Sequence, residues 1–197
     1  MATRLAVSGV TIGSIAPSFR RSLEASNKSP RTVVGYFEAV NLFSRFLADR
    51  GMPLTVDGIR REHVEAFVVD LLAHWKPATA NTRFRSLQQL FKWLIEEGEI
   101  KASPMVHMKP PVIPESPPPV LTEDQLKALF RVCEGNDFEA RRDMAIIRLF
   151  ADTGMRRSEL ANLRMESLDL DLHVAVVEGK GRRTRACAFG KKTALAL

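Results

Sequence analysis

Apolar residues recur every three to four positions through the first half of the chain, a spacing that is typical of amphipathic helices. Ser29-Pro30 predicts the start of one helix, because proline is tolerated in a first turn, and Gly51 followed by Pro53 predicts its end. The helices predicted here span residues 19–25, 30–50, 61–75 and 79–97. Four helices of this kind are typical of a small bundle.

On each long helix the apolar side chains fall on one face, and we expect these faces to form the core of the bundle. The residues concerned are Tyr36, Val40, Phe43 and Leu47, then Val64, Phe67, Val68, Leu71 and Leu72, then Phe84, Leu87, Leu90, Phe91 and Leu94.

The second half of the chain changes from a helical pattern to a strand pattern. Thr122 and Gln125 form a capping box, which predicts a helix with Leu126, Leu129, Phe130 and Cys133 on its apolar face. Helices are also predicted over residues 139–152 and 158–163, separated by the break at Thr153-Gly154. Alternation with a period of two then predicts strands over residues 173–177 and 184–189, joined by a turn, and a helix begins near Lys191.

Seven prolines lie between Ser103 and Val120. Proline removes a backbone donor and fixes φ, so this stretch is expected to run extended as a semi-rigid spacer. The sequence therefore predicts a tail over residues 1–13, a helical domain over 14–102, a linker over 103–120 and a second domain over 121–197.

The formal net charge is +6 and the sequence pI is about 9.7, as is common among nucleic-acid-binding proteins. Residues 1–110 carry 15 basic and 10 acidic side chains, residues 111–177 carry 8 and 12, and residues 178–197 carry 6 and 1. Positive charge is therefore concentrated in the helical half and at the end.

Two classes of protein are disfavoured by the composition. No apolar run approaches the length of a membrane span, and the first residues lack the long apolar core of a secretory signal. Cys133 and Cys187 lie far apart with no metal-ligand spacing around them, so we expect two reduced thiols, a cytoplasmic protein and no bound metal.

Residues 153–160, Thr-Gly-Met-Arg-Arg-Ser-Glu-Leu, carry the candidate chemistry. The helix break places Arg156 at the start of a new helix, with Glu159 on the same side. An arginine held by a carboxylate is a fixed fork of donors that suits a phosphate group. Gly179-Lys180-Gly181 at a hairpin tip would allow a tight turn, from which Lys180 could reach a phosphate or a leaving oxygen. An ordinary solvated helix face and an ordinary turn are the alternatives for each motif taken alone.

Taken in order, these motifs resemble the first half of the catalytic domain of tyrosine recombinases, the phage integrase family with its Xer-like members. Ser29-Pro30-Arg31-Thr32 with Tyr36, and residues 76–94, resemble the first and last long helices of that family's helical core-binding domain. The resemblance covers residues 14–197. It implies a mainly α fold: a four-helix SAM-like domain joined by the proline-rich linker to a partial α+β catalytic domain with a small antiparallel sheet.

The resemblance also implies residue roles. Arg156 would bind the scissile phosphate, Glu159 would steady it, and Lys180 would protonate the leaving 5′ oxygen after attack by a tyrosine hydroxyl. Preorganised cations stabilise the charge that builds on phosphorus in such a reaction. The family requires no cofactor, and its partners are double-stranded DNA and further protomers, with no membrane or small-molecule substrate.

The family's second catalytic arginine and its tyrosine nucleophile are not found among these 197 residues. The one tyrosine, Tyr36, lies among the apolar positions of a first-domain helix. We therefore expect a DNA-binding protein that does not cleave DNA alone. Three interpretations stay open: a shortened integrase sequence, a non-catalytic module or decoy that occupies recombination sites beside an intact protomer, and an inert remnant.

DNA affinity is expected from basic and polar residues near the starts of the two long helices, where exposed N–H groups also favour phosphate. These candidates are Lys28, Arg31, Thr32, Lys76, Thr79, Asn81, Thr82, Arg83 and Arg85, and the hairpin adds Arg182 and Arg183. Solvated surface is the alternative for each of them.

Overall fold

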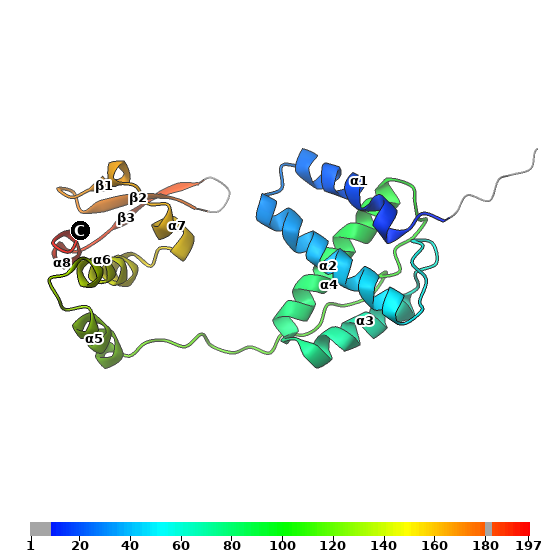
Figure 1. Ribbon diagram of the computed structural model, residues 1–197, viewed down its shortest axis with the longest axis horizontal. Helices are drawn as coiled ribbons and strands as arrows, with labels where there is room; N and C mark the ends of the chain where they lie inside the picture. The colour runs from blue at the N-terminus through cyan, green and yellow to red at the C-terminus, as the bar shows by residue number, and fades with distance from the viewer. Residues whose placement is uncertain (1–8, 180–182) are drawn as a thin grey trace, which may run out of the picture. The chain divides into compact units, whose positions relative to one another are not determined.

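The computed structural model describes residues 9–179 and 183–197, and the chain divides into two compact units, Met1–Ser116 and Pro117–Leu197. Figure 1 shows helices alone in unit 1, and helices with a small sheet in unit 2. The division falls within the proline-rich stretch, where residues 110–122 form neither helix nor strand. The described chain is mainly helical with a small antiparallel sheet, which confirms the predicted fold class.

Unit 1 is built from α1 (Ile12–Ala25), α2 (Pro30–Asp49), α3 (Arg61–His74) and α4 (Pro77–Glu96). The two longest helices, α2 and α4, pack against each other, α1 packs on α2, and α3 packs on α4 (Figure 1). Each long helix begins with a proline in its first turn, and Gly51 and Gly98, both with positive φ, follow the ends of α2 and α4. The predicted start of α2 and the predicted ends of both helices are therefore confirmed, whereas α4 begins two residues before the predicted position 79.

The first helix is longer than its sequence predicts. Pro17 lies inside α1, and a proline there is expected to end a helix. The helix instead begins at Ile12, where the Thr11 side chain accepts from the Ser14 backbone N–H and Ser14 returns a hydrogen bond. Burial of Ile12 and Ile15 stabilises these additional residues of the helix, so Ile12 and Gly13, which were assigned to the N-terminal tail, are part of α1.

The core of unit 1 contains most of the predicted apolar positions. The fully buried large side chains come from all four helices and include Phe19, Phe43, Phe67, Phe84 and Phe91. The prediction for Leu72 was wrong, since this side chain is 44% exposed. Leu71 already occupies the inward position of that turn, and its neighbour lies about 100° around the helix.

Unit 2 contains α5 (Glu123–Val132), α6 (Phe138–Thr153), α7 (Arg157–Ala161), a 3-10 turn (Met165–Ser167) and α8 (Lys191–Ala194). Its antiparallel sheet has the order β1 (Leu168–Asp169), β2 (Val174–Glu178) and β3 (Thr184–Ala188). The predicted hairpin is β2–β3, and the two-residue β1 was not predicted because it is too short to show a period.

The core of unit 2 is small. Leu149, Met155, Ala175, Val177, Cys187 and Phe189 are buried between α6 and the sheet. The capping box of Thr122 and Gln125 is present as predicted, but α5 buries none of its residues. Its apolar face therefore does not join the described core. In the described part of the chain, no helix is long and apolar enough to cross a membrane.

Candidate functional site

Arg156 owes its position to the way α6 ends. Gly154 adopts the left-handed conformation (φ +59°) that closes the helix, and glycine reaches it without steric cost. Met155 is buried and anchors the connection to the core. Arg156 is then the N-cap of α7 and has extended backbone angles. Its backbone is therefore fixed between the buried Met155 and the first turn of α7.

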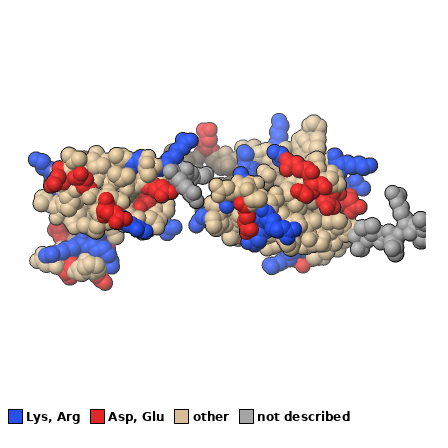
Figure 2. All heavy atoms as spheres, turned by 90° about the horizontal axis from the view of Figure 1, so that it is seen from above, with Lys and Arg blue, Asp and Glu red and all other residues tan. Residues whose placement is uncertain are grey.

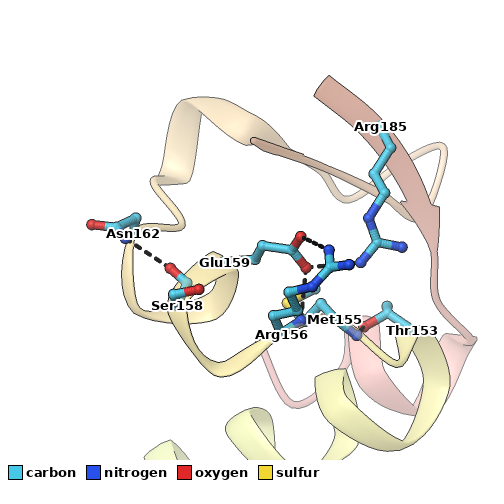
Figure 3. A network of polar contacts seen from close by, with 7 residues as sticks. All are labelled: Thr153, Met155, Arg156, Ser158, Glu159, Asn162 and Arg185. Carbon is cyan, nitrogen blue, oxygen red and sulfur yellow. Dashed lines mark hydrogen bonds and ion pairs between the residues drawn. The ribbon is translucent and has the colours of Figure 1, made fainter. Parts of the chain in front are cut away.

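A buried carboxylate joins two arginines at this point (Figure 3). Glu159 Oε2 accepts from the backbone N–H of Arg156 at 2.7 Å, and Oε1 accepts from Arg156 Nη1 at 2.7 Å. Arg185 on β3 donates from Nη2 to Glu159 Oε2 at 2.8 Å. The Glu159 side chain is 2% exposed, whereas Arg156 is 64% and Arg185 43% exposed.

These contacts keep Glu159 ionised. The backbone N–H of Arg156 and the guanidinium of Arg185 lower the pKa of the Glu159 carboxyl from its ordinary 4.5 to about 2, against the opposing effect of burial. One negative charge therefore lies between two positive ones. The cluster of Arg156, Glu159 and Arg185 retains a net positive charge, and donors of Arg156 that Glu159 does not use remain in solvent, where an anion can reach them.

Gly179, the residue that follows β2, lies next to this cluster. A Cβ at this position would come within 3.2 Å of Glu159 Oε1 and 3.7 Å of Arg156 Nη1. Its N–H donates to the carbonyl of Arg183 at 2.7 Å, which closes the hairpin. A side chain at this position would therefore have to displace the Glu159 carboxylate by a few tenths of an ångström.

The predicted hairpin residues are only partly placed. Lys180 and Arg182 lie outside the described residues, and Arg183 is exposed. Arg156 and Glu159 are brought together, whereas the predicted meeting of Arg156 and Lys180 remains a prediction. Arg185 was missed by motif reasoning, although the sequence carries a signal: in the predicted strand 184–189 it shares a face with Cys187 and Phe189, which lie two and four residues later. An arginine on the inward face of a strand needs a charged partner.

On the face shown in Figure 2, Lys and Arg side chains are interspersed with Asp and Glu on both units. On this face the sign of charge therefore does not delimit a binding surface. A more specific feature is a groove of about 660 Å³ between the starts of α2 and α4. It is lined by Arg31, Val34, Gly35, Glu38, Ala78, Thr79, Thr82 and Arg83.

Arg83, Asn81 and Arg85, which were all predicted to bind DNA, make hydrogen bonds within unit 1. Arg83 donates to Glu38 at 2.8 Å and to the carbonyl of Gly35 at 3.2 Å, and its side chain is 20% exposed. Asn81 donates to the carbonyl of Pro111 at 2.8 Å and accepts from Arg85.

The other predicted residues of unit 1 lie at the start of α2 or α4 or directly before it. Thr79 is partly buried, and Lys28, Arg31, Thr32, Lys76 and Thr82 are exposed. Thr32 also shares a hydrogen bond with the cap residue Ser29.

Tyr36 is partly buried against the core of unit 1, with its ring centroid 6.3 Å from that of Phe19. This packing accounts for the residue as a structural side chain of α2.

Comparison with known proteins matches both units. Residues 16–99 match the phage integrase N-terminal SAM-like domain, and residues 119–197 match the phage integrase family. The tyrosine recombinase XerC of Bacillus licheniformis is 33% identical over 167 residues, covering 83% of this chain and 54% of the relative. XerC of Myxococcus xanthus is 27% identical over 188 residues, covering 95% of this chain and 62% of the relative.

Solved structures agree on the fold. A lambda integrase dimer bound to a COC′ core site is similar with a TM-score of 0.71 and 19% identity, over 90% of this chain and 48% of that one. The Tn1549 transposon integrase in complex with circular intermediate DNA gives a TM-score of 0.70 and 18% identity, over 95% of this chain and 63% of that one. The chain spans about half the length of these proteins. By its two matched domains and its XerC relatives, it belongs to the phage integrase family of tyrosine recombinases.

Proposed function

We propose that this chain supplies DNA binding and part of the phosphate-binding site of a site-specific recombinase. The observation that carries the proposal is the exposed Arg156, held at a helix start by a buried carboxylate that is itself ionised. Its solvent-facing donors would bind oxygens of a DNA phosphodiester. Negative charge that develops on those oxygens in the transition state would strengthen the contact. Double-stranded DNA and a second recombinase protomer are the partners that this proposal requires.

The groove between α2 and α4 is the proposed DNA contact of unit 1. Arg31, Thr79 and Thr82 line it, and the N-termini of both helices add exposed N–H groups that favour phosphate. Arg83 would act differently from the sequence-based expectation, because its guanidinium is bound to Glu38 and Gly35. In this proposal it sets the spacing of the two helices, and Arg31 supplies the phosphate contact.

Replacing Arg31 with alanine is expected to lower affinity for duplex DNA roughly threefold to tenfold, because one phosphate contact is lost. The slope of log affinity against log salt concentration should fall by about one. Gel-shift titrations at several salt concentrations measure both quantities. Wild-type chain that shows no salt-sensitive binding to duplex DNA at low ionic strength would exclude the proposed DNA contact altogether.

Lys92→Ala is the matched control for this experiment. Lys92 lies on α4, nine residues beyond Arg83 and hence on the opposite side of the helix, where it pairs with Glu96. The variant removes the same unit of charge, and its affinity and salt slope should match those of the wild type. Equal losses in both variants would show that net charge, rather than the groove, determines binding.

Gly35 provides a test in which stability and binding change in opposite directions. A Cβ at Gly35 would meet nothing within 4 Å, so no packing within the unit requires a glycine in the middle of this helix. Gly35→Ala should therefore raise the free energy of unfolding of unit 1 by about 0.5–1 kcal/mol. Because Gly35 lines the groove, the added methyl group should also weaken DNA binding.

Gly13→Ala is the control for the glycine experiment, since Gly13 lies on α1 and its Cβ would meet only Thr11 Oγ1 at 3.9 Å. Denaturation and gel-shift measurements on both variants should show stabilisation in each and weakened DNA binding only in Gly35→Ala. Unchanged affinity in Gly35→Ala would mean that DNA does not approach this part of α2.

A second candidate function is a non-catalytic module that occupies recombination sites. It is favoured by the packing of Tyr36, the single tyrosine of these 197 residues, against the core of unit 1. We expect residues 1–197 alone to form no covalent complex with a nicked recombination-site duplex that traps phosphotyrosyl intermediates. A denaturation-resistant protein–DNA adduct that Tyr36→Phe abolishes would contradict this expectation.

A further inference from the structure

Arg185 lies on the inward face of the sheet at its edge. The register pairs it with Val177 on β2, and Ala175 and Cys187 form the next inward pair. All three of these neighbours are buried. The Arg185 side chain is 43% exposed there, and the part that lies against the sheet is paired with Glu159, 26 residues earlier in the chain.

The two oxygens of Glu159 are divided between the two arginines. Oε1 accepts from the side chain of Arg156, while Oε2 accepts from the Arg156 backbone and from Arg185. Arginine and carboxylate groups otherwise favour a two-bond arrangement, in which one guanidinium occupies both oxygens. Arg185 fills the position that the second bond would need, so the side chain of Arg156 makes a single bond to Glu159 (Figure 3).

We propose that Arg185 is a positioning residue for Arg156: by occupying Glu159 Oε2 it prevents the Arg156 guanidinium from folding onto the carboxylate and keeps its remaining donors free for a DNA phosphate. The inference rests on the proposed role of Arg156. Arg185 also has an electrostatic effect on phosphate binding. The cluster with Arg185 has one positive charge in excess, whereas Arg156 and Glu159 alone would be neutral.

The phosphate-binding part of the test compares Arg185→Gln with Arg131→Gln in the full chain. Arg131 is exposed on α5, so its variant removes the same charge from unit 2 without touching the cluster. Each variant is titrated with inorganic phosphate, and binding is followed in nitrogen-15 spectra of the arginine side chains. The Arg156 signal is identified as the one that is lost in Arg156→Lys. Arg185→Gln is expected to weaken phosphate binding at Arg156 roughly threefold to tenfold. Arg131→Gln should leave it unchanged.

The same spectra give a readout that needs no phosphate. In the wild type the Arg156 guanidinium should rotate about its Nε–Cζ bond, and in Arg185→Gln a two-bond contact with Glu159 should slow that rotation. Loss of fold alone would speed it. Arg185→Lys keeps the charge and one donor to Oε2, so it should restore most of the wild-type rotation and phosphate affinity. This variant replaces Arg185→Gln in the test if the glutamine variant unfolds.

The outcomes separate the two proposals. Rotation and phosphate affinity in Arg185→Gln that match Arg131→Gln would overturn the positioning role. A wild-type Arg156 that does not respond to phosphate would overturn the proposed function, while slowed rotation in Arg185→Gln would still support the positioning of Arg156 by Arg185.

Discussion

Replacing Phe43 with alanine is expected to lower the free energy of unfolding of unit 1 by about 3–5 kcal/mol. Phe43 is 0% exposed, and its ring centroid lies 5.0 Å from that of Phe67 on α3 and 6.3 Å from that of Phe91 on α4. Truncation would leave a cavity where three helices meet. Because small domains are stable by only about 5–15 kcal/mol, this single change removes a large share of the stability of the unit.

Tryptophan fluorescence measures this effect selectively. The two tryptophans of the chain, Trp75 and Trp93, both belong to unit 1, and Trp93 packs against Phe19 with ring centroids 5.1 Å apart. Urea unfolding followed by this signal should show a lower midpoint for Phe43→Ala. Leu72→Ala, which truncates an exposed apolar side chain of α3, should change the midpoint little. Similar midpoints for the two variants would contradict the central role of Phe43.

Phe43→Ala should also weaken DNA binding, since the proposed groove depends on the packing of α2 against α4. The loss should be recovered where the variant is folded, for example at lower temperature or with added osmolyte. A folded variant that still fails to bind DNA would show that Phe43 affects the groove in another way than through stability.

Unit 2 is expected to lose stability in acid, and Glu159→Gln should remove a large part of that loss. The pKa of Glu159 is about 2 in the folded protein against an ordinary 4.5. A depressed carboxyl pKa contributes stability that is fully present above the unfolded value and disappears as the pH falls through the folded one. The wild type should therefore weaken as the pH falls from about 4.5 to about 2.

The measurement is urea unfolding at a series of pH values, followed by the amide signals of β2 and β3. At neutral pH, Glu159→Gln should be less stable than the wild type, because two guanidiniums lose their charged acceptor. Its stability should depend less on pH. Some dependence remains, because the Thr193 hydroxyl and the Gly190 N–H lower the pKa of Asp152, which joins α6 to α8. Parallel pH profiles for wild type and variant would contradict the assignment.

Local pattern was sufficient for most of the helices, for the ends of α2, α4 and α6 and for the motif, whereas it missed the first turns of α1. Thr122 and Gln125, or Gly154 at the end of α6, act over three or four residues, and hydrogen bonds of that range are encoded by neighbouring side chains. The contact between Arg156 and Glu159 is equally local, since a spacing of three residues along a helix brings two side chains together. For these features the sequence alone was enough to predict the contact.

Tertiary structure decided which of the charged residues are free to bind. Arg83 and Glu38 are 45 residues apart, and Arg185 and Glu159 are 26 apart, so only the packing of α2 on α4 and of the sheet on α7 brings them together. The same holds for α5, whose apolar face was predicted by periodicity but whose residues are all exposed or only partly buried. Amphipathic spacing specifies that a face is apolar, whereas burial depends on which other element lies against it, and that choice is made by the whole fold.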